Sequence, residues 1–208
     1  MTGLFSTAYF PPIAYMAALM HCDNVIIEAK ETFPKQTYRN RMQIVTAGGL
    51  RILSVPTIRT NHSRTDQVEI DYKDRWPIIH LRTLDAAYAA SPYYMYFRDD
   101  IATLLHTQHD NLLSLNQSIL RWLLSKLKIN CNVSVTTQWQ ANTNEGTVDL
   151  RNIFSPKVPY PTDNYPQYYQ VFADRMPFLP NLTILDLLFN LGPEAHEHLH
   201  NIPQTAIK

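Results

Sequence analysis

Three basic side chains lie close together in the segment from Phe33 to Arg41, whose sequence is FPKQTYRNR. Lys35, Arg39 and Arg41 fall within seven residues of a chain whose formal net charge is zero. In an extended strand alternate side chains share a face, so Arg39 and Arg41 would point one way and Asn40 the other. Two guanidinium groups on one face can hold a phosphate or a carboxylate from two directions. The spacing therefore indicates an anion-binding clamp.

The same arginines have a purely structural interpretation. They would then form a solvated strand face and pair with nearby carboxylates, for instance Glu28 or Glu31. Tyr9 and Tyr15 flank the candidate site and could stack on a sugar or a base, although most tyrosines simply pack in the core. Both interpretations of the segment stay open at the level of sequence.

His80 is the candidate proton acceptor. It stands at helical spacing from Trp76, Leu84 and Tyr88, which places it on the buried stripe of a helix. A histidine in that position can act as a general base with a near-neutral pKa. It can equally be a core residue that hydrogen-bonds a backbone carbonyl.

Three further polar residues are candidates for orienting a substrate. Asn116 interrupts the leucine face of a helix, four residues from both Leu112 and Leu120. Burying an amide without partners costs about 1–3 kcal/mol, so Asn116 should bond either the backbone or a ligand. Asp186 and Asn190 lie four apart on a later helix and either line a pocket or brace a loop.

Motifs for metals and cofactors are not found in the sequence. His196 and His200 would face one way on a helix, but no carboxylate is placed to complete a ligand set, so we expect no metal. Five glycines are too few and too scattered for a phosphate-binding loop or a dinucleotide fingerprint, and we expect no cofactor. Cys22 and Cys131 are expected to be reduced thiols.

The first third of the chain predicts an α/β arrangement. Strands are expected at Leu4–Tyr9 and Val25–Ala29, joined by a buried helix over 11–21, which is typical of a parallel pair with a crossover helix. Tyr38–Val45 and Arg51–Ile58 are expected to form a β-hairpin turned by Gly48-Gly49.

The remaining two thirds predict mainly helices. A leucine stripe makes the helix over Asn111–Lys128 the clearest of them. The other expected elements are an edge strand at Gln67–Tyr72, helices from Asp74, over Ser91–Thr107 and over Leu182–Leu191, a strand at Asn132–Gln138 and an ordered loop over 141–170. The expected fold is a single α/β domain, residues 1–208, with a mixed sheet flanked by helices and a β-hairpin insertion at about 38–58.

Composition limits the class of protein. Apolar residues make up 45% and charged residues 17%, a globular balance. A zero net charge gives no field toward nucleic acid or anionic lipid, so any phosphate must be bound by a local basic cluster. We expect no nucleic-acid partner, and from the basic segment 33–41 we expect a small-molecule anionic ligand. No apolar run is long enough to span a membrane, and we expect a cytoplasmic protein of undetermined oligomeric state.

Several stretches together resemble the WbqC-like protein family. The opening turn Ala8–Tyr15, the basic segment 33–41, the stretch Ala87–Tyr93 and the closing helix around Leu182–Asn190 occur in the family's order. Trp76, His80 and Asn116 match as well. The chain departs from the pattern in two places, at Thr7-Ala8 and over 141–164, where a glycine-rich stretch is missing.

The resemblance implies a role in cell-surface polysaccharide biosynthesis. For some members it implies transfer of an amino acid to a sugar. Together with the basic segment, this makes our first hypothesis the transfer of an acyl or aminoacyl group to an anionic sugar, phosphorylated or nucleotide-linked. In that scheme Lys35, Arg39 and Arg41 hold the anion, His80 accepts a proton, and Asn40 and Asn116 orient the substrate. A non-catalytic domain that binds a ligand or a partner protein is the alternative, since acid–base residues are scarce.

Overall fold

The structure is a computed structural model that describes residues 1–60, 62–157 and 160–203. Its main sheet has four strands in the order β7-β2-β1-β8, and every pairing is parallel. The strands are β1 (Thr2–Ser6), β2 (Asn24–Glu28), β7 (Asn132–Val135) and β8 (Thr147–Asp149). The predicted parallel pair joined by a crossover helix is confirmed, because α1 (Ile13–Met20) connects β1 to β2.

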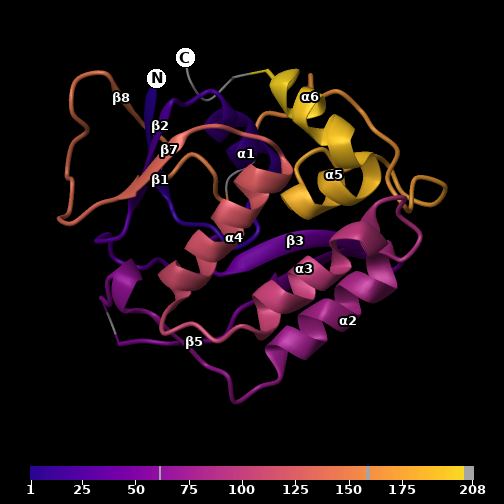
Figure 1. Ribbon diagram of the computed structural model, residues 1–208, viewed down its shortest axis with the longest axis horizontal. Helices are drawn as coiled ribbons and strands as arrows, with labels where there is room; N and C mark the ends of the chain where they lie inside the picture. The colour runs from indigo at the N-terminus through magenta and orange to yellow at the C-terminus, as the bar shows by residue number, and fades with distance from the viewer. Residues whose placement is uncertain (61, 158–159, 204–208) are drawn as a thin grey trace.

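A separate antiparallel hairpin crosses the middle of the molecule (Figure 1). It consists of β3 (Arg41–Thr46) and β4 (Gly49–Ser54), so the predicted insertion is confirmed with shorter strands. Thr46 pairs with Gly49, which leaves Ala47 and Gly48 as the loop, and Gly49 has a φ of 100° that favours glycine. A second small pair joins β5 (Thr57–Ile58) to β6 (Glu69–Ile70).

Helices flank the sheets and supply most of the core. The α/β class is therefore confirmed, with the antiparallel strands in small sheets of their own. On α4 the predicted leucine face is buried, and the Asn111 side chain accepts a hydrogen bond from the Ser114 amide at the start of the helix. The helices are α2 (Trp76–Tyr88), α3 (Tyr94–His106), α4 (Leu112–Lys126), α5 (Ile184–Leu191) and α6 (Ala195–His200), with short 3-10 turns η1 (Thr65–Gln67) and η2 (Gly192–Glu194).

The expectation of an unbroken loop over 141–170 is wrong at one point. Thr147–Asp149 is strand β8, which pairs with β1 and forms an edge of the main sheet. Three residues are too few to show the alternation by which a strand is identified in a sequence. Because β8 is parallel to β1, it carries the residues that follow it to the edge of the sheet where β1 and β2 also end.

Within the described residues no helix is long and apolar enough to cross a membrane.

Candidate functional site

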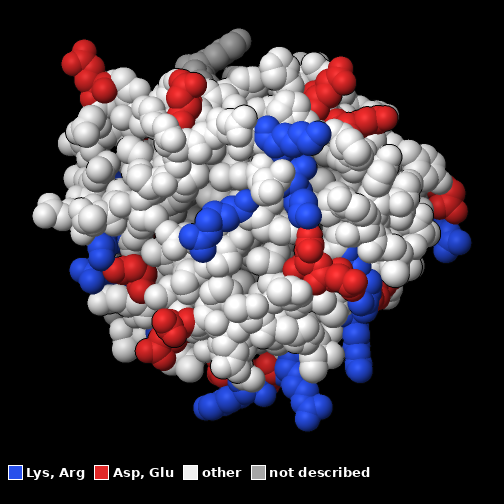
Figure 2. Space-filling view, viewed as in Figure 1, with Lys and Arg blue, Asp and Glu red and all other residues white. Residues whose placement is uncertain are grey.

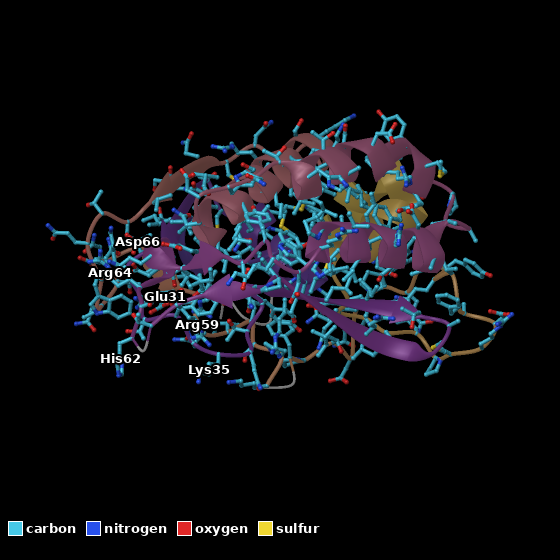
Figure 3. The ribbon with its side chains drawn as sticks, turned by 90° about the horizontal axis from the view of Figure 1, so that it is seen from below. Glu31, Lys35, Arg59, His62, Arg64 and Asp66 are labelled. Atoms are coloured by element: carbon cyan, nitrogen blue, oxygen red, sulfur yellow. The ribbon has the colours of Figure 1, made fainter. Side chains whose placement is uncertain are left out.

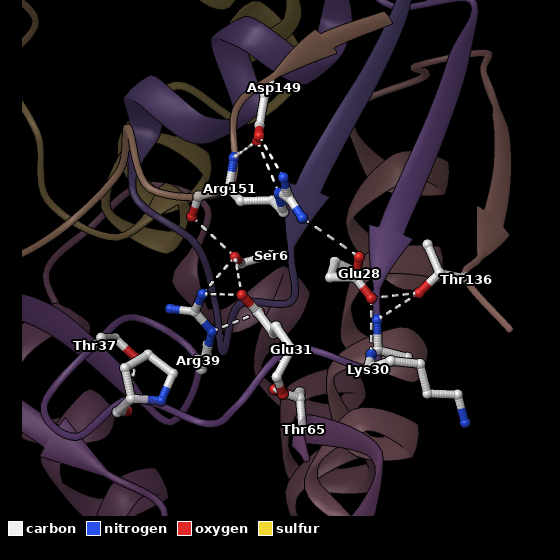
Figure 4. A network of polar contacts seen from close by, with 12 residues as sticks. Ser6, Glu28, Lys30, Glu31, Thr37, Arg39, Thr65, Thr136, Asp149 and Arg151 are labelled. Carbon is white, nitrogen blue, oxygen red and sulfur yellow. Dashed lines mark hydrogen bonds and ion pairs between the residues drawn. The ribbon is translucent and has the colours of Figure 1, made fainter. Parts of the chain in front are cut away.

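Polar side chains gather where the parallel strands end, the edge at which α/β sheets commonly place ligands (Figure 4). Ser6 closes β1, Glu28 closes β2 and Asp149 closes β8. Glu28 is fully buried, accepting hydrogen bonds from the Thr136 hydroxyl at 2.6 Å and from the amides of Lys30 and Gln140. We call these groups, with Glu31, Arg39 and Arg151, the carboxyl-edge network.

Arg39 is held in this network by a two-pronged ion pair. Its Nε donates to one oxygen of Glu31 at 2.7 Å and its Nη2 to the other at 2.6 Å. Nη2 also donates to the Ser6 hydroxyl at 2.5 Å, and both charged side chains are almost fully buried. Nη1 has no hydrogen bond within the part of the chain that the structure describes, and Figure 4 shows it pointing away from Glu31.

Arg151 enters the network from the segment after β8. It forms a two-pronged pair with Asp149, at 2.9 and 2.5 Å, and donates from Nη1 to the carbonyl of Gln140 at 2.5 Å. The same nitrogen lies 3.6 Å from Glu28, and the guanidinium stacks over the Trp139 ring. The hydrogen bonds from the Arg151 guanidinium lower the pKa of the Asp149 carboxyl group, and the same bonds raise the pKa of Arg151.

Two adjoining hollows open beside the network. The inner one, the small cavity, has about 10 Å³, room for one water-sized group, and is lined by Ser6, Thr7, Ala8, Tyr15, Tyr38, Arg39, Leu150, Arg151 and Phe154. The outer one, the groove, has about 350 Å³. Tyr38 and Phe154 line both hollows, so the small cavity and the groove adjoin each other.

The groove combines aromatic walls with few charges. Tyr38, Phe154 and Tyr160 supply rings, and Gln43 and Asn181 supply amides. Among the described lining residues Lys157 is the charged one, and no carboxylate lines either hollow. Burial raises the pKa of the Tyr38 hydroxyl to about 12, so it stays protonated and donates to Gln43 at 3.0 Å.

The structure brings the opening turn and the basic segment together. The Tyr9 amide donates to the Tyr38 carbonyl at 2.8 Å, and the Tyr15 hydroxyl donates to the Ser6 carbonyl at 2.9 Å. Burial raises the pKa of both tyrosines, so their hydroxyls are protonated donors. Tyr15 lines the small cavity, whereas Tyr9 lies in the core behind it.

The His80 ring is buried and hydrogen-bonded to two partners, Tyr9 and the backbone of Ser54. Its Nδ1 lies 2.8 Å from the Tyr9 hydroxyl, and the ring is also hydrogen-bonded to the Ser54 backbone. Burial lowers its pKa to about 4, so the ring is neutral and accepts the Tyr9 proton while donating to the Ser54 carbonyl. These surroundings are those of the core histidine that the sequence left as an alternative.

The amide candidates bond the backbone. Asn116 donates to the Arg39 carbonyl at 2.8 Å, which ties α4 to the basic segment, and Asn40 donates to the Val55 carbonyl at 2.9 Å. Arg41 begins β3 opposite Ser54, and its Nε is buried without a partner among the described residues. Arg39 precedes β3 in a turn, so the two arginines do not alternate along one strand as the sequence suggested.

Lys35 lies apart from both hollows. It is exposed, and Figure 3 places it at the outer edge of the molecule, in the region of Arg59, His62 and Arg64. Arg59 lies over the Phe33 ring at 5.1 Å, and Arg64 pairs with Asp66 at 3.4 Å. This basic edge therefore belongs to the surface of the loops around residues 30–66.

Asp186 and Asn190 belong to a second polar centre in the core. Asp186 accepts hydrogen bonds from the hydroxyls of Tyr88 at 2.9 Å and Tyr168 at 2.5 Å, and from Gln170 at 3.1 Å. Burial raises its pKa. Asn190 donates to the Asp186 backbone carbonyl within α5, and it is the Asp186 carboxylate that links the segment around Tyr168 to that helix.

Sequence reasoning missed Ser6 and Arg151, whereas Glu31 was named as a possible partner of the arginines and does pair with Arg39, in the interior rather than on a solvated face. Arg151 was missed because strand β8 was not recognised. The available signal is the run Thr147-Val-Asp-Leu-Arg151, in which two β-branched residues precede Asp149 and Arg151.

In the described part of the chain no three or more His, Cys, Asp or Glu side chains gather to hold a metal ion. Figure 2 shows basic and acidic side chains interspersed over one face, in keeping with the zero net charge.

Comparison with known proteins places this geometry in a family. An uncharacterized protein of Mycobacterium tuberculosis (strain ATCC 25618 / H37Rv), Rv1507c, is 28% identical in an alignment of 226 positions, gaps included, that covers 95% of this chain and 96% of that protein. No solved structure matches. Residues 7–155, from the opening turn to just beyond Arg151, match the WbqC-like protein family. The chain belongs to the WbqC-like protein family.

Proposed function

We propose that the chain is a transferase of cell-surface polysaccharide assembly that moves an acyl or aminoacyl group onto an anionic sugar held in the groove. The polysaccharide context comes from the family. Lys157 supports the anionic substrate, because it is the charged residue among those described on the groove and forms no ion pair with another described residue. Arg39 and Arg151 line the adjoining cavity as hydrogen-bond donors whose charges are already paired with Glu31 and Asp149.

The shape of the hollows suits a sugar. About 350 Å³ accommodates one or two sugar rings, and the rings of Tyr38, Phe154 and Tyr160 offer apolar surfaces for a sugar face. Arg39 lines the small cavity, and its Nη1, which has no hydrogen bond to another described residue, is the nitrogen available to a substrate oxygen there. Glu31 and Ser6 fix the other two nitrogens, so this donor is oriented before the substrate arrives.

The reaction proposed is a direct transfer. An amino or hydroxyl group of the sugar attacks the carbonyl of an activated acyl donor, and the new C–N or C–O bond forms. The bond to the donor's leaving group breaks, and the leaving group departs with its electron pair and takes up the proton that the sugar group releases. Neither Cys22 nor Cys131 lines the groove, so no thiol intermediate is proposed. His80 in this scheme positions Tyr9, whose backbone holds the groove residue Tyr38.

The substrate class is tested by calorimetric titration with glucuronic acid, glucose and UDP-N-acetylglucosamine. The variant Lys157→Glu reverses the exposed charge on the groove, and Lys73→Glu is the control at an exposed lysine outside it. We expect the acidic ligands to bind and glucose to bind more weakly. Lys157→Glu should weaken the acidic ligands by about tenfold at low salt while Lys73→Glu does not. Equal binding of charged and neutral sugars, or equal effects of the two variants, would refute the anionic substrate.

A non-catalytic sugar-binding domain is the second candidate, and the environment of His80 favours it. The one histidine expected to accept a proton is neutral, buried and bonded on both sides. Such a domain would bind the same ligands in the same groove without changing them. The two candidates are therefore separated by product formation rather than by affinity.

A further inference from the structure

A second surface of the chain combines exposed isoleucines with arginines that form no ion pair with another described residue. On α2 the residues Ile78, Ile79 and Arg82 share one helix face, opposite the buried Trp76, His80 and Leu84, and the exposed Arg75 precedes the helix as its N-cap residue. Ile79 is 51% exposed and Ile78 37%. Strand β4 adds Arg51 and Ile52, the latter 47% exposed. We call Arg51, Ile52, Arg75, Ile78, Ile79 and Arg82 the Arg–Ile face.

The face is shaped as well as exposed. Two hollows, of about 370 and 390 Å³, lie between β4 and α2, and Arg51 and Ile79 line both of them. Within the described residues none of the three arginines forms an ion pair, and Asp74 is the one carboxylate that lines either hollow. Three basic groups against one acidic group leave a local positive surplus on a chain with no net charge.

This combination identifies the kind of partner. An apolar centre rimmed by arginines is the composition of a protein-binding surface, and arginine is frequent among the residues that dominate binding. Free arginines complement an acidic partner, and exposed isoleucines complement an apolar stripe on it. A nucleotide or a coenzyme would meet the arginines but leave the isoleucines against water. The matching partner is an acidic helical protein.

The position of the face gives that partner a role. β4 separates the two sites: Leu50 lines the groove, and its neighbour Arg51 lines both hollows of the Arg–Ile face. A protein docked on the face therefore lies next to the groove, within reach of a flexible arm. We infer that the Arg–Ile face docks an acidic carrier protein that presents the acyl or aminoacyl donor as a thioester on such an arm.

This inference rests on the proposed transfer reaction and completes it. The sugar amine attacks the thioester carbonyl, the C–N bond forms and the C–S bond breaks. The carrier thiolate leaves with the electron pair and takes up the proton that the amine releases. The chain then needs no nucleophile of its own, because the thioester already activates the acyl group.

The test uses the full chain and two donors of the same alanyl group. One is an acidic carrier protein with alanine on its phosphopantetheine arm, and the other is the small N-acetylcysteamine thioester of alanine. The variant Arg51→Glu/Arg82→Glu reverses two charges of the face, and Arg121→Glu is the control at an exposed arginine of α4. Carrier affinity is measured by titration and product by mass spectrometry with an amino sugar acid as acceptor.

The double variant should raise the carrier Kd and slow product formation from the carrier by about tenfold or more. It should leave product from the small thioester unchanged, and Arg121→Glu should change neither. Unaltered carrier binding by the double variant overturns the inference. The inference is also overturned if alanyl-coenzyme A is as good a donor as the alanylated carrier. It is overturned as well if the wild-type chain self-associates or binds phosphatidylglycerol vesicles and the double variant does not, because the face would then dock a second copy or a membrane. If neither donor gives product, the proposed reaction fails, while the carrier titration still decides the docking surface separately.

Discussion

The ion pair between Arg39 and Glu31 makes a sharp prediction about stability. Both side chains are almost fully buried, and the pair is joined by two hydrogen bonds of 2.7 and 2.6 Å. Replacing Arg39 with Met leaves the Glu31 carboxylate buried with the Ser6 hydroxyl as its remaining partner. Breaking a buried pair in this way costs about 3–5 kcal/mol. For a chain of 208 residues the melting temperature should fall by about 6–20 °C.

Urea denaturation of a small set of variants measures this cost. Lys35→Ala, at an exposed lysine of the same segment, should change the free energy of unfolding by about 0.5 kcal/mol at most. Arg39→Met/Glu31→Leu removes both charges and should recover most of the loss, because a buried pair replaced by apolar groups is often neutral. A single variant Arg39→Met as stable as Lys35→Ala would refute the structural account of this arginine.

Three further predictions concern single residues. The pKa of His80 is about 4 when folded and 6.5 unfolded, so the unfolded chain binds more protons between these values. His80 should then remove about 3 kcal/mol of stability as the pH falls from 6.5 to 4, and the pH-dependent melting of His80→Gln should lack this loss. The raised pKa of Asp186 means that its contribution is largest in acid and falls as the pH rises through the folded pKa. Calorimetry should therefore show a cost for Asp186→Asn that shrinks toward neutral pH; a cost that grows would contradict the assignment. Gly192→Ala should lower the melting temperature, since Gly192 has a φ of 53° and an added Cβ would lie 2.6 Å from the Tyr93 ring; unchanged melting would count against this packing.

Much of the fold follows from local patterns in the sequence. A strand, a buried helix and a strand within thirty residues predict the parallel pair β1–β2, and the leucine stripe predicts α4, because in both cases the period of the apolar residues matches the element. Strand β8 escapes this reasoning. It has three residues, and its place beside β1 is fixed by pairing across more than a hundred residues of chain.

The site was harder to predict than the fold. Sequence spacing indicates that Arg39 matters, but it does not show whether its partner is a ligand or Glu31. The structure gives it a partner and, among the described residues, leaves one guanidinium nitrogen without a hydrogen bond. Arg151 is 112 residues further along the chain and reaches the same cavity only through β8. Contacts of this range depend on topology, which residue periodicity does not encode.

Transfer to a sugar in the groove is tested most directly by a change in the mass of the acceptor. The chain is incubated with an amino sugar acid and an alanyl thioester, and the sugar is analysed by mass spectrometry over time. The account predicts a time-dependent product heavier by one alanyl residue, formed more slowly by Lys157→Glu and at the normal rate by Lys73→Glu. Saturable binding of the acceptor with no product from any thioester donor would contradict the transferase and leave a sugar-binding domain.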